Sequence, residues 1–550
     1  MKNKSTLRWI FGCFKRYLPG VAFVSVLGAT LSLLTVGVIM VSREIINNAQ
    51  AGITGDTLRR NIIALCAIVV AEIVLNLVNG YYRARLSAKM DMHLKDRLFC
   101  KLICKDYSEI TRMHSGDIVN RFASDVDVVV SGVSTIIPTT VSIVTKLIAG
   151  IGTAIFLDPI IAAVIVVIGF IFPLLGRFMS KKYKHLHKES QRTNGIVRSF
   201  LQESVQNIIV IKTFMADNHI RRKLIHYLRS NYLVKMKRSL LSVGTHAGLF
   251  GTFSLGYYGV LIWGALGIAA GTLQYGTLFA FMQLVSLLRN PLQNISGLMP
   301  QYYASIASAE RLIELESIKD EPAPTPANRN ELYAKMRAIT AKNLSFAYDE
   351  REVIKDSDFS IKHGSICAVM GESGTGKSTL FRLLLGLYSP TKGTLCLECD
   401  DGDITVDSSV RCLFSYVPQG AMVLSGTIRD NITFLSGNVT DEQLENAAKQ
   451  AVIYDFITSL PDGFDTVIGE RGLGLSEGQL QRIAIARALL TDAPILLLDE
   501  CTSALDTMTE IKLLENLKNA KDKTVILITH RTAALDICDS VIRVEDCKIS

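Results

Sequence analysis

The apolar residues of the chain are gathered in long runs within its first 300 positions. The last of these runs, residues 239–288, contains no Asp, Glu, Lys or Arg. Because a membrane-spanning helix needs about 20 mostly apolar residues, this run is long enough for two helices, separated by a Gly-rich turn near 264–276. The pattern predicts six membrane spans, in residues 18–42, 61–82, 128–157 and 160–176 and twice within 239–288.

The segments between the predicted spans differ in length and charge. The two long ones, 83–127 and 177–238, are rich in Lys and Arg, whereas the others are short and carry few basic residues. Basic loops stay on the cytoplasmic side of a membrane, so the long segments, the N-terminus and the second half of the chain are predicted to be cytoplasmic. Apolar residues within 86–102 recur every three or four positions, which predicts that membrane helices continue into the cytoplasm.

Three charged residues lie within or beside the predicted spans. Glu72 is in the second span, Lys146 is in the third, and Arg289 directly follows the last apolar run. A charge inside a membrane normally faces the bundle interior and marks a transport pathway or an ion pair. A charge near a span end can instead extend to the interface, which we expect for Arg289. Both interpretations stay open for Glu72 and Lys146.

The chain changes character after the sixth span. Residues 316–337 contain three prolines and many charges, which is typical of an exposed linker. From about 339, short apolar strands alternate with helical patterns, as in an α/β domain. The predicted organisation is therefore multidomain: an all-α transmembrane domain of six helices (1–315), a linker (316–338) and an α/β nucleoside-triphosphatase domain (339–550), the last assigned from the motifs described below.

Composition agrees with a membrane protein of more than one domain. The chain has 550 residues, too many for one core, of which 49% are hydrophobic. Its net charge of +8 arises from basic residues between apolar runs, which favours a membrane over nucleic acid as the partner. The 11 cysteines are scattered, and Cys396-x-x-Cys399 has no second pair. Free thiols in a reducing cytosol are thus expected, without zinc.

The candidate chemistry begins with a glycine-rich loop, 371–379. It fits the phosphate-loop pattern G-x-x-x-x-G-K-[ST], between an apolar strand at 365–370 and a helical pattern. This order directs backbone N–H groups and a helix N-terminus at a bound phosphate. Lys377 would reach the β- and γ-phosphates, and the Ser378 hydroxyl would ligate Mg²⁺. The loop residues expected to bind nucleotide are Gly371, Ser373, Gly374, Thr375, Gly376, Lys377, Ser378 and Thr379.

A second apolar run, 495–498, ends in two carboxylates. A buried parallel strand brings its last residues to the carboxyl edge of the sheet, beside the phosphate loop. Asp499 would there hold Mg²⁺. Glu500, one position later, would activate a water molecule for attack on the γ-phosphate.

With these motifs the chain resembles an ABC (ATP-binding cassette) transporter of the exporter type over nearly its whole length. Val417-Pro418-Gln419 resembles the Q-loop, and Leu475-Ser476-Glu477-Gly478-Gln479 stands at the place of the LSGGQ signature. Ser503-Ala504-Leu505-Asp506 resembles the D-loop and Ile528-Thr529-His530-Arg531 the switch region. Further segments that resemble the family are His114-Ser115-Gly116-Asp117, residues 203–216, Ser308-Ala309-Glu310-Arg311 and Gly469-Glu470-Arg471-Gly472.

The resemblance implies roles for these residues. Gln419 would contact the metal or the attacking water, and His530 would contact the γ-phosphate. Tyr348, which the sequence places ahead of the first long strand, would stack on adenine.

The resemblance also implies a two-chain site. Each site would take Lys377 and the other loop residues from one chain, and Ser476, Gly478 and Gln479 from a second. Asp506 is also expected to bind nucleotide. A chain with one cassette is then a half-transporter, expected to be a homodimer in the cell membrane, with a heterodimer as the alternative. ATP would draw the two cassettes together, and hydrolysis would release them.

The resemblance leads to an expectation of ATP-driven export of a small molecule, lipid or peptide. Two alternatives stay open: an importer that uses the exporter fold, as in some siderophore systems, and a nucleotide-gated protein that does not translocate. The presence of Glu500 and His530 argues against the second, because a gate need not hydrolyse ATP.

Two features depart from the family pattern. Glu477 replaces the first glycine of the signature; it either faces solvent or marks a heterodimer in which one site is weakened. The chain stops at Ser550, with Cys547 where a glycine is common, whereas exporter cassettes usually continue for another helix. A naturally short end and a truncated one are both compatible with this.

Overall fold

The computed structural model describes residues 2–549 except 54, 323–327, 373, 421, 435, 438, 470–473 and 520–522. The chain divides into two compact units. The first, here called the helical unit, is Met1–Leu102 with Gly116–Ser317, and the second, the cassette unit, is Ile103–Ser115 with Ile318–Ser550. The predicted boundaries at 315 and 338 stay a prediction.

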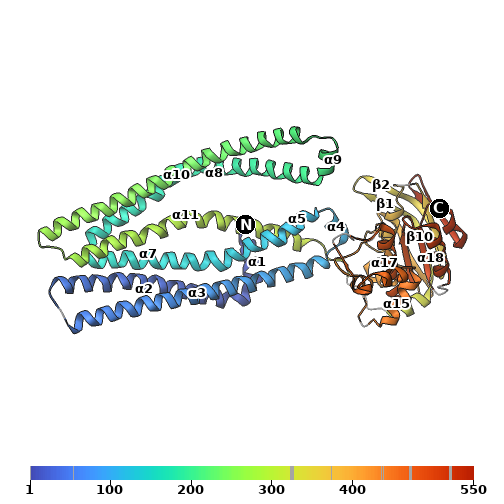
Figure 1. Ribbon diagram of the computed structural model, residues 1–550, viewed down its shortest axis with the longest axis horizontal. Helices are drawn as coiled ribbons and strands as arrows, with labels where there is room; N and C mark the ends of the chain where they lie inside the picture. Colours follow the sequence, from blue (N-terminus) through green and yellow to red (C-terminus); the bar gives the residue numbers. More distant parts are fainter. Residues whose placement is uncertain are drawn as a thin grey trace. The chain divides into compact units, whose positions relative to one another are not determined.

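Long helices make up the helical unit (Figure 1). The helices α3, α8 and α10 have 48 or more residues, so each is roughly 70 Å long or longer, more than twice the apolar thickness of a bilayer. Their length agrees with helices that continue into the cytoplasm, which stays a prediction. The elements are α1 (Lys2–Phe14), α2 (Leu18–Gln50), α3 (Asp56–Ile103), α5 (Ser115–Asn120), α6 (Val126–Ser131), α7 (Ile137–Leu157), α8 (Pro159–Gln206), α9 (Ile208–Thr213), α10 (Asp217–Ala269) and α11 (Tyr275–Ser317).

The positions of these helices follow the predicted spans. Within the described part of the chain, four segments are long and apolar enough to cross a membrane: Ser5–Gln50, Asp56–Ile103, Ser115–Leu157 and Phe250–Ala269. The predicted fourth span falls on α8, where most side chains from 165 to 181 lie outside the described residues, and the predicted sixth span falls on α11. The chain between α10 and α11 turns at Gly271, inside the predicted Gly-rich segment.

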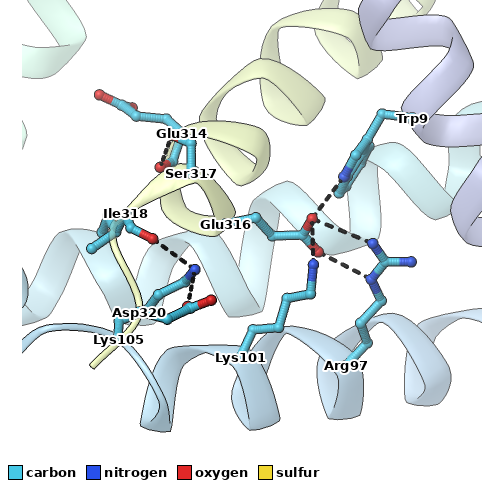
Figure 2. Close-up of polar contacts among 9 residues, drawn as sticks. All are labelled: Trp9, Arg97, Lys101, Lys105, Glu314, Glu316, Ser317, Ile318 and Asp320. Atoms are coloured by element: carbon cyan, nitrogen blue, oxygen red, sulfur yellow. Dashed lines mark hydrogen bonds and ion pairs between the residues drawn. The ribbon is translucent and has the colours of Figure 1, made fainter. Parts of the chain in front are cut away.

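A carboxylate that is largely shielded from solvent joins three helices of the helical unit (Figure 2). Glu316, near the end of α11, accepts a hydrogen bond of 2.9 Å from the indole N–H of Trp9 on α1. It also forms ion pairs with Arg97 at 3.0 Å and Lys101 at 3.1 Å, both on α3. The shared carboxylate therefore fixes α1 and α3 against the last turn of α11.

Two sheets form the frame of the cassette unit. One has the strand order β2-β1-β4-β5, and the other has the order β12-β11-β3-β10-β9-β6. The strands of the two sheets are β1 (Met336–Tyr348), β2 (Arg351–Lys362), β3 (Ile366–Gly371), β4 (Lys392–Cys399), β5 (Ile404–Thr405), β6 (Phe414–Val417), β9 (Ile495–Asp499), β10 (Thr524–Ile528), β11 (Ser540–Glu545) and β12 (Lys548–Ile549). A small pair, β7 (Gly426–Thr427) and β8 (Val467–Ile468), lies apart from both sheets in the strand pairing.

The larger sheet is parallel from β11 to β6 and is covered on both faces. Successive residues of a strand point to opposite faces, and β9 shows this directly: Ile495 and Leu497 belong to one apolar core, Leu496 and Leu498 to another. A strand that is buried on both faces must be apolar throughout, as predicted for this run. The helices of the unit are α4 (Tyr107–Thr111), α12 (Arg329–Lys335), α13 (Lys377–Leu384), α14 (Ile428–Thr433), α15 (Asp441–Gln450), α16 (Tyr454–Ser459), α17 (Glu477–Leu490) and α18 (Thr507–Asn519).

The short helix α4 packs within the cassette unit, although it lies about 200 residues before the rest of that unit in the sequence. Residue Lys105 forms an antiparallel bridge with Asp320, and its ammonium group bonds the Ile318 carbonyl at 2.7 Å (Figure 2). The ring of Tyr107 on α4 lies 5.8 Å from the ring of Tyr388, edge to face. The segment 83–127, which was predicted to be cytoplasmic, thus contributes an element to the α/β domain, which the sequence did not predict.

One predicted position was wrong. Tyr348 does not precede the first long strand; it is the last residue of β1. The strand begins at Met336 because alternate residues such as Ile339 and Ala341 are buried there, and the apolar run continues through Phe346.

Candidate functional site

The carboxyl ends of four parallel strands bring the predicted site residues to one edge of the sheet. In the register, Ile528 of β10 pairs with Val369 of β3 on one side and Asp499 of β9 on the other. Val417 of β6 pairs with Leu498. The chain segments that leave these strands therefore start side by side, and they carry the phosphate loop, His530, Glu500 and Gln419.

The phosphate loop needs its glycines for conformation and for space. Gly374 has φ of 86° and Gly376 has φ of 109°, a region that residues with a Cβ rarely adopt. A Cβ at Gly376 would also lie 2.8 Å from Val353, whereas nothing lies within 4 Å of one at Gly374. The loop thus leaves an open concave backbone directly before α13, where a phosphate fits. Ser373 lies outside the described residues.

Lys377 lies at the start of α13 with only 5% of its surface exposed. Its ammonium group donates to the carbonyl oxygens of Gly371 and Glu372, each at 2.7 Å. Burial lowers the pKa of Lys377, and the neighbouring carboxylates Glu500 and Asp499 oppose that shift. The side chain is therefore held at the loop by two neutral oxygens, which an anionic phosphate can replace as stronger partners.

Ser378 and Asp499 form the oxygen cluster predicted to hold a metal. The Ser378 hydroxyl donates to Asp499 at 3.3 Å, and the Tyr416 hydroxyl donates to the other carboxylate oxygen at 3.3 Å. Burial raises the pKa of Asp499, while these two hydrogen bonds lower it. A hydroxyl beside a nearly buried carboxylate is a donor set that fits Mg²⁺, which prefers hard oxygen ligands.

Glu500 is in contact with the two other predicted polar residues. The amide group of Gln419 donates to one of its oxygens at 2.7 Å, and His530 Nε2 lies 3.4 Å from the other. The backbone of Glu500 has φ of 48°, which is uncommon for a residue with a side chain and often marks a functional position. Gln419 contacts Glu500 rather than Asp499, so its predicted contact with the metal stays a prediction.

A cavity of about 440 Å³ opens beside the loop, and Tyr348 and Lys377 line it with Gln419 and Glu500. The Tyr348 hydroxyl lies 3.3 Å from that of Thr379 and accepts a hydrogen bond from Arg382 at 3.1 Å. Four residues at this site were not predicted from the sequence: Arg351, Val353, Arg382 and Tyr416. Tyr416 had a usable signal, because it lies in an apolar strand that leads directly to Gln419.

The signature residues lie elsewhere in the chain's own cassette. Ser476 accepts a hydrogen bond from the Gln479 N–H at 3.3 Å, and Gln479 accepts one from the Ser476 N–H at 2.8 Å. This reciprocal capping box fixes the start of α17. Among the described residues that line the cavity, none belongs to the signature. Glu477 is exposed, and residues 470–472 of the predicted exporter-specific segment lie outside the described residues.

Gly478 packs tightly against the segment 503–506. A Cβ at Gly478 would lie 2.7 Å from the Ala504 carbonyl oxygen, closer than real Cβ contacts. Asp506 accepts a hydrogen bond from the Thr509 N–H at 3.0 Å and so caps α18. The signature and the predicted D-loop are therefore in direct backbone contact within one chain.

Arg531 links the switch region to that same segment, which the sequence analysis did not anticipate. Its guanidinium donates to the carbonyl oxygens of Ser503 at 2.9 Å and Leu505 at 3.1 Å. It also pairs with Glu510 at 2.6 Å, whose side chain is only 2% exposed. The residue after His530 thus holds the backbone of 503–505 in place.

Comparison with known proteins agrees with this geometry. Residues 20–292 match the family model of the ABC transporter transmembrane region, and residues 354–503 match that of the ABC transporter domain. A protein of Rickettsia felis described as an export ATP-binding/permease protein is 30% identical over 96% of this chain and 91% of its own. An ATP-dependent lipid A-core flippase of Syntrophus aciditrophicus is 29% identical over 88% of this chain and 82% of its own. The fold matches the structure of a bacterial Atm1-family ABC exporter with ATP bound, with a TM-score of 0.79, 24% identity and coverage of 98% and 94%.

Proposed function

Because the chain belongs to the ABC transporter family, we propose that it is an exporter half-transporter that couples ATP hydrolysis to outward transport across the cell membrane. Its helical unit spans the membrane several times, and its cassette lies in the cytoplasm. The observation that carries the proposal is that one edge of the sheet brings together Lys377, Ser378, Asp499, Glu500 and His530, in a chain that also contains the membrane helices.

The proposed roles follow from the contacts. Lys377 leaves its two carbonyl partners to bind the β- and γ-phosphates, and the Tyr348 ring stacks on adenine. Ser378 and Asp499 would hold Mg²⁺, with Gln419 as a further ligand, and the bound ion would neutralise charge on the phosphates. Glu500 accepts the proton of the attacking water, and His530 contacts the γ-phosphate.

A second half-transporter has to complete the site. The chain supplies one phosphate loop and one signature, and its cavity beside the loop contains no signature residue among the described ones. Ser476, Gly478 and Gln479 of the partner, presented at the start of its α17, would close over the nucleotide. We propose a homodimer. Glu477 does not argue against it, because an exposed acidic residue in the first helical turn interacts favourably with the helix dipole.

The direction of transport rests on relatives. The Rickettsia felis protein is named for export and the Syntrophus aciditrophicus protein for flipping a lipid. We propose export of a small molecule, lipid or peptide, taken from the cytoplasm or the inner leaflet.

The function is tested with the full chain reconstituted in lipid. Mg²⁺-dependent ATPase activity is expected in the wild type and at least about a hundredfold less in Glu500→Gln, with ATP binding retained. Two copies with different affinity tags are expected to purify together when co-expressed. An ATPase activity that is the same in wild type and Glu500→Gln would overturn the proposal, and failure of the tagged copies to associate would favour the heterodimer.

A further inference from the structure

A polar cavity of about 320 Å³ lies between α2, α3 and α7, within the membrane-spanning part of the helical unit. Each helix contributes polar residues at regular intervals. On α3 these are Glu72, Asn76, Asn79 and Arg83, and on α7 they are Thr139, Ser142 and Lys146. Spacings of three and four residues place such positions on one face of a helix. The polar faces of otherwise apolar spans are therefore directed at one another.

Hydrogen bonds join the three helices around this cavity. Ser32 on α2 and Ser142 on α7 lie 2.9 Å apart through their hydroxyls. The Thr35 hydroxyl on α2 donates to Glu72 at 3.1 Å. Arg83 donates to Thr139 at 2.8 Å and to the Thr135 carbonyl at 3.1 Å. Each pair of helices is thus connected, and the walls of the cavity are held in place by hydrogen bonds between the helices.

The contacts of Arg83 also place Glu72 and Lys146 at similar depth. By the predicted orientation, α3 enters the cytoplasm at its C-terminal end and α7 leaves it. Glu72 lies 11 residues before Arg83, and Lys146 lies 11 residues after Thr135, so each is about 16 Å deeper in the membrane. That is about half of the ~30 Å apolar layer.

The two charged groups at that depth have no opposite charge beside them, and one buried acceptor of the cavity, nearer to Arg83, has no donor. In the described part of the chain, no ion pair joins Glu72 to Lys146 or either of them to another charge. The partner of Glu72 there is the neutral hydroxyl of Thr35. Asn79 Oδ1 is buried and has no hydrogen-bond partner. Charges at mid-membrane are costly and normally face a partner or a pathway, and a buried acceptor normally has a donor.

We propose that this cavity binds the polar group of a transported molecule that carries an ammonium and an anionic group a few ångströms apart. Glu72 accepts hydrogen bonds from the ammonium, and Lys146 pairs with the anion. Asn79 Oδ1, two helical turns from Glu72 on α3, accepts a hydrogen bond from another donor of the molecule. A purely anionic group would lie against Glu72, and a purely apolar one would leave all of these atoms without partners. The proposal rests on the proposed transport function and narrows its substrate class.

Two sources offer this chemistry, an ethanolamine phospholipid and a soluble zwitterion such as a dipeptide. The test uses the full chain in nanodiscs of phosphatidylglycerol. ATPase activity is measured as phosphatidylethanolamine is added in one arm and alanyl-alanine in the other. A saturable change of activity is expected with one of the probes, and the responding arm identifies the source.

Variants connect the response to the cavity. Glu72→Gln and Lys146→Met are each expected to raise the half-saturating probe concentration about tenfold or more, the effect of losing one charged hydrogen bond. The exchange Glu72→Lys with Lys146→Glu is expected to recover most of the response. Thr30→Val is the matched control, since the exposed Thr30 on α2 bonds only its own helix, at Val26.

Basal ATPase activity, measured without probe, separates a failure of the proposed cavity from a failure of the proposed transport function. It is expected to stay within about twofold of the wild type in Thr30→Val, and in each cavity variant it reports that the protein is folded. If neither probe changes the activity, or if the cavity variants respond like Thr30→Val, this inference is overturned while the proposed function stands. If basal activity itself does not depend on Glu500, the proposed function fails.

Discussion

The contact between Gly478 and Ala504 permits a test in which a gain in helix propensity opposes a loss from overpacking. Alanine is a better helix former than glycine by about 1 kcal/mol, so Gly478→Ala at the start of α17 would ordinarily stabilise the protein. Here the new Cβ would lie 2.7 Å from a backbone oxygen, and ordinary contact begins at 3.4 Å. The backbone of 503–506 would have to move by about 0.7 Å.

The expected balance is destabilising. Overpacking of this kind costs about 1–3 kcal/mol, which exceeds or cancels the gain in helix propensity. In a thermal scan of the detergent-purified protein, the cassette transition is expected to shift down by a few degrees. Because the displaced backbone begins three residues after Glu500, the ATPase turnover number should fall at least about tenfold, with nucleotide binding to the phosphate loop unchanged.

A helical glycine without a neighbour serves as the control. Nothing lies within 4 Å of a Cβ at Gly195 on α8, so Gly195→Ala is expected to keep full ATPase activity and stability. If Gly478→Ala raises the unfolding temperature and keeps full turnover, the contact with Ala504 does not constrain the segment and the reasoning is refuted.

Three further predictions concern the charged residues of the cassette. Burial raises the pKa of Asp499, so the contribution of Asp499 to stability falls as the pH rises from its unfolded pKa near 4 towards the folded value. Without nucleotide, Asp499→Asn should therefore unfold at a higher temperature than the wild type at neutral pH, but not near pH 4. An equal difference in unfolding temperature at both pH values would contradict this. Arg531→Ala leaves Glu510, which is 2% exposed, without its partner. It should lower the free energy of unfolding by about 2 kcal/mol, less than for a fully buried pair because Arg531 is 37% exposed. In chemical denaturation, the double variant Arg531→Met with Glu510→Gln should recover part of this loss. Glu477→Gly should change homodimer ATPase activity by less than about threefold, because Glu477 is exposed; a gain of tenfold or more would instead indicate a site weakened by Glu477.

Much of the nucleotide site could be predicted because its chemistry is local in sequence. The phosphate loop needs a glycine pattern, a lysine and a hydroxyl within nine residues, and the strand that ends at Asp499 must be apolar throughout. The fold class and the family are confirmed. The individual roles of Glu500, Gln419 and His530 stay predictions, although the structure places their side chains in contact.

Other features were missed for identifiable reasons. Tyr348 was placed ahead of its strand because the burial of β1 alternates irregularly, with bulges between Ala341 and Ala347. The capping box of Ser476 and Gln479 could have been found, since S-x-x-Q is a known helix start. The packing of α4 in the cassette unit could not, because it depends on contacts between residues more than 200 positions apart.

The polar faces of α2, α3 and α7 bear on how the protein is made. A single helix that carried Glu72, Asn79 and Arg83 into lipid would expose groups that hydrocarbon cannot hydrogen-bond. The long apolar stretch of this helix still favours insertion. Each helix can therefore enter the bilayer alone but reaches its lowest free energy only beside the other two. Their association is expected to be an early step of assembly, and chains in which one of these helices is altered should be prone to membrane quality control.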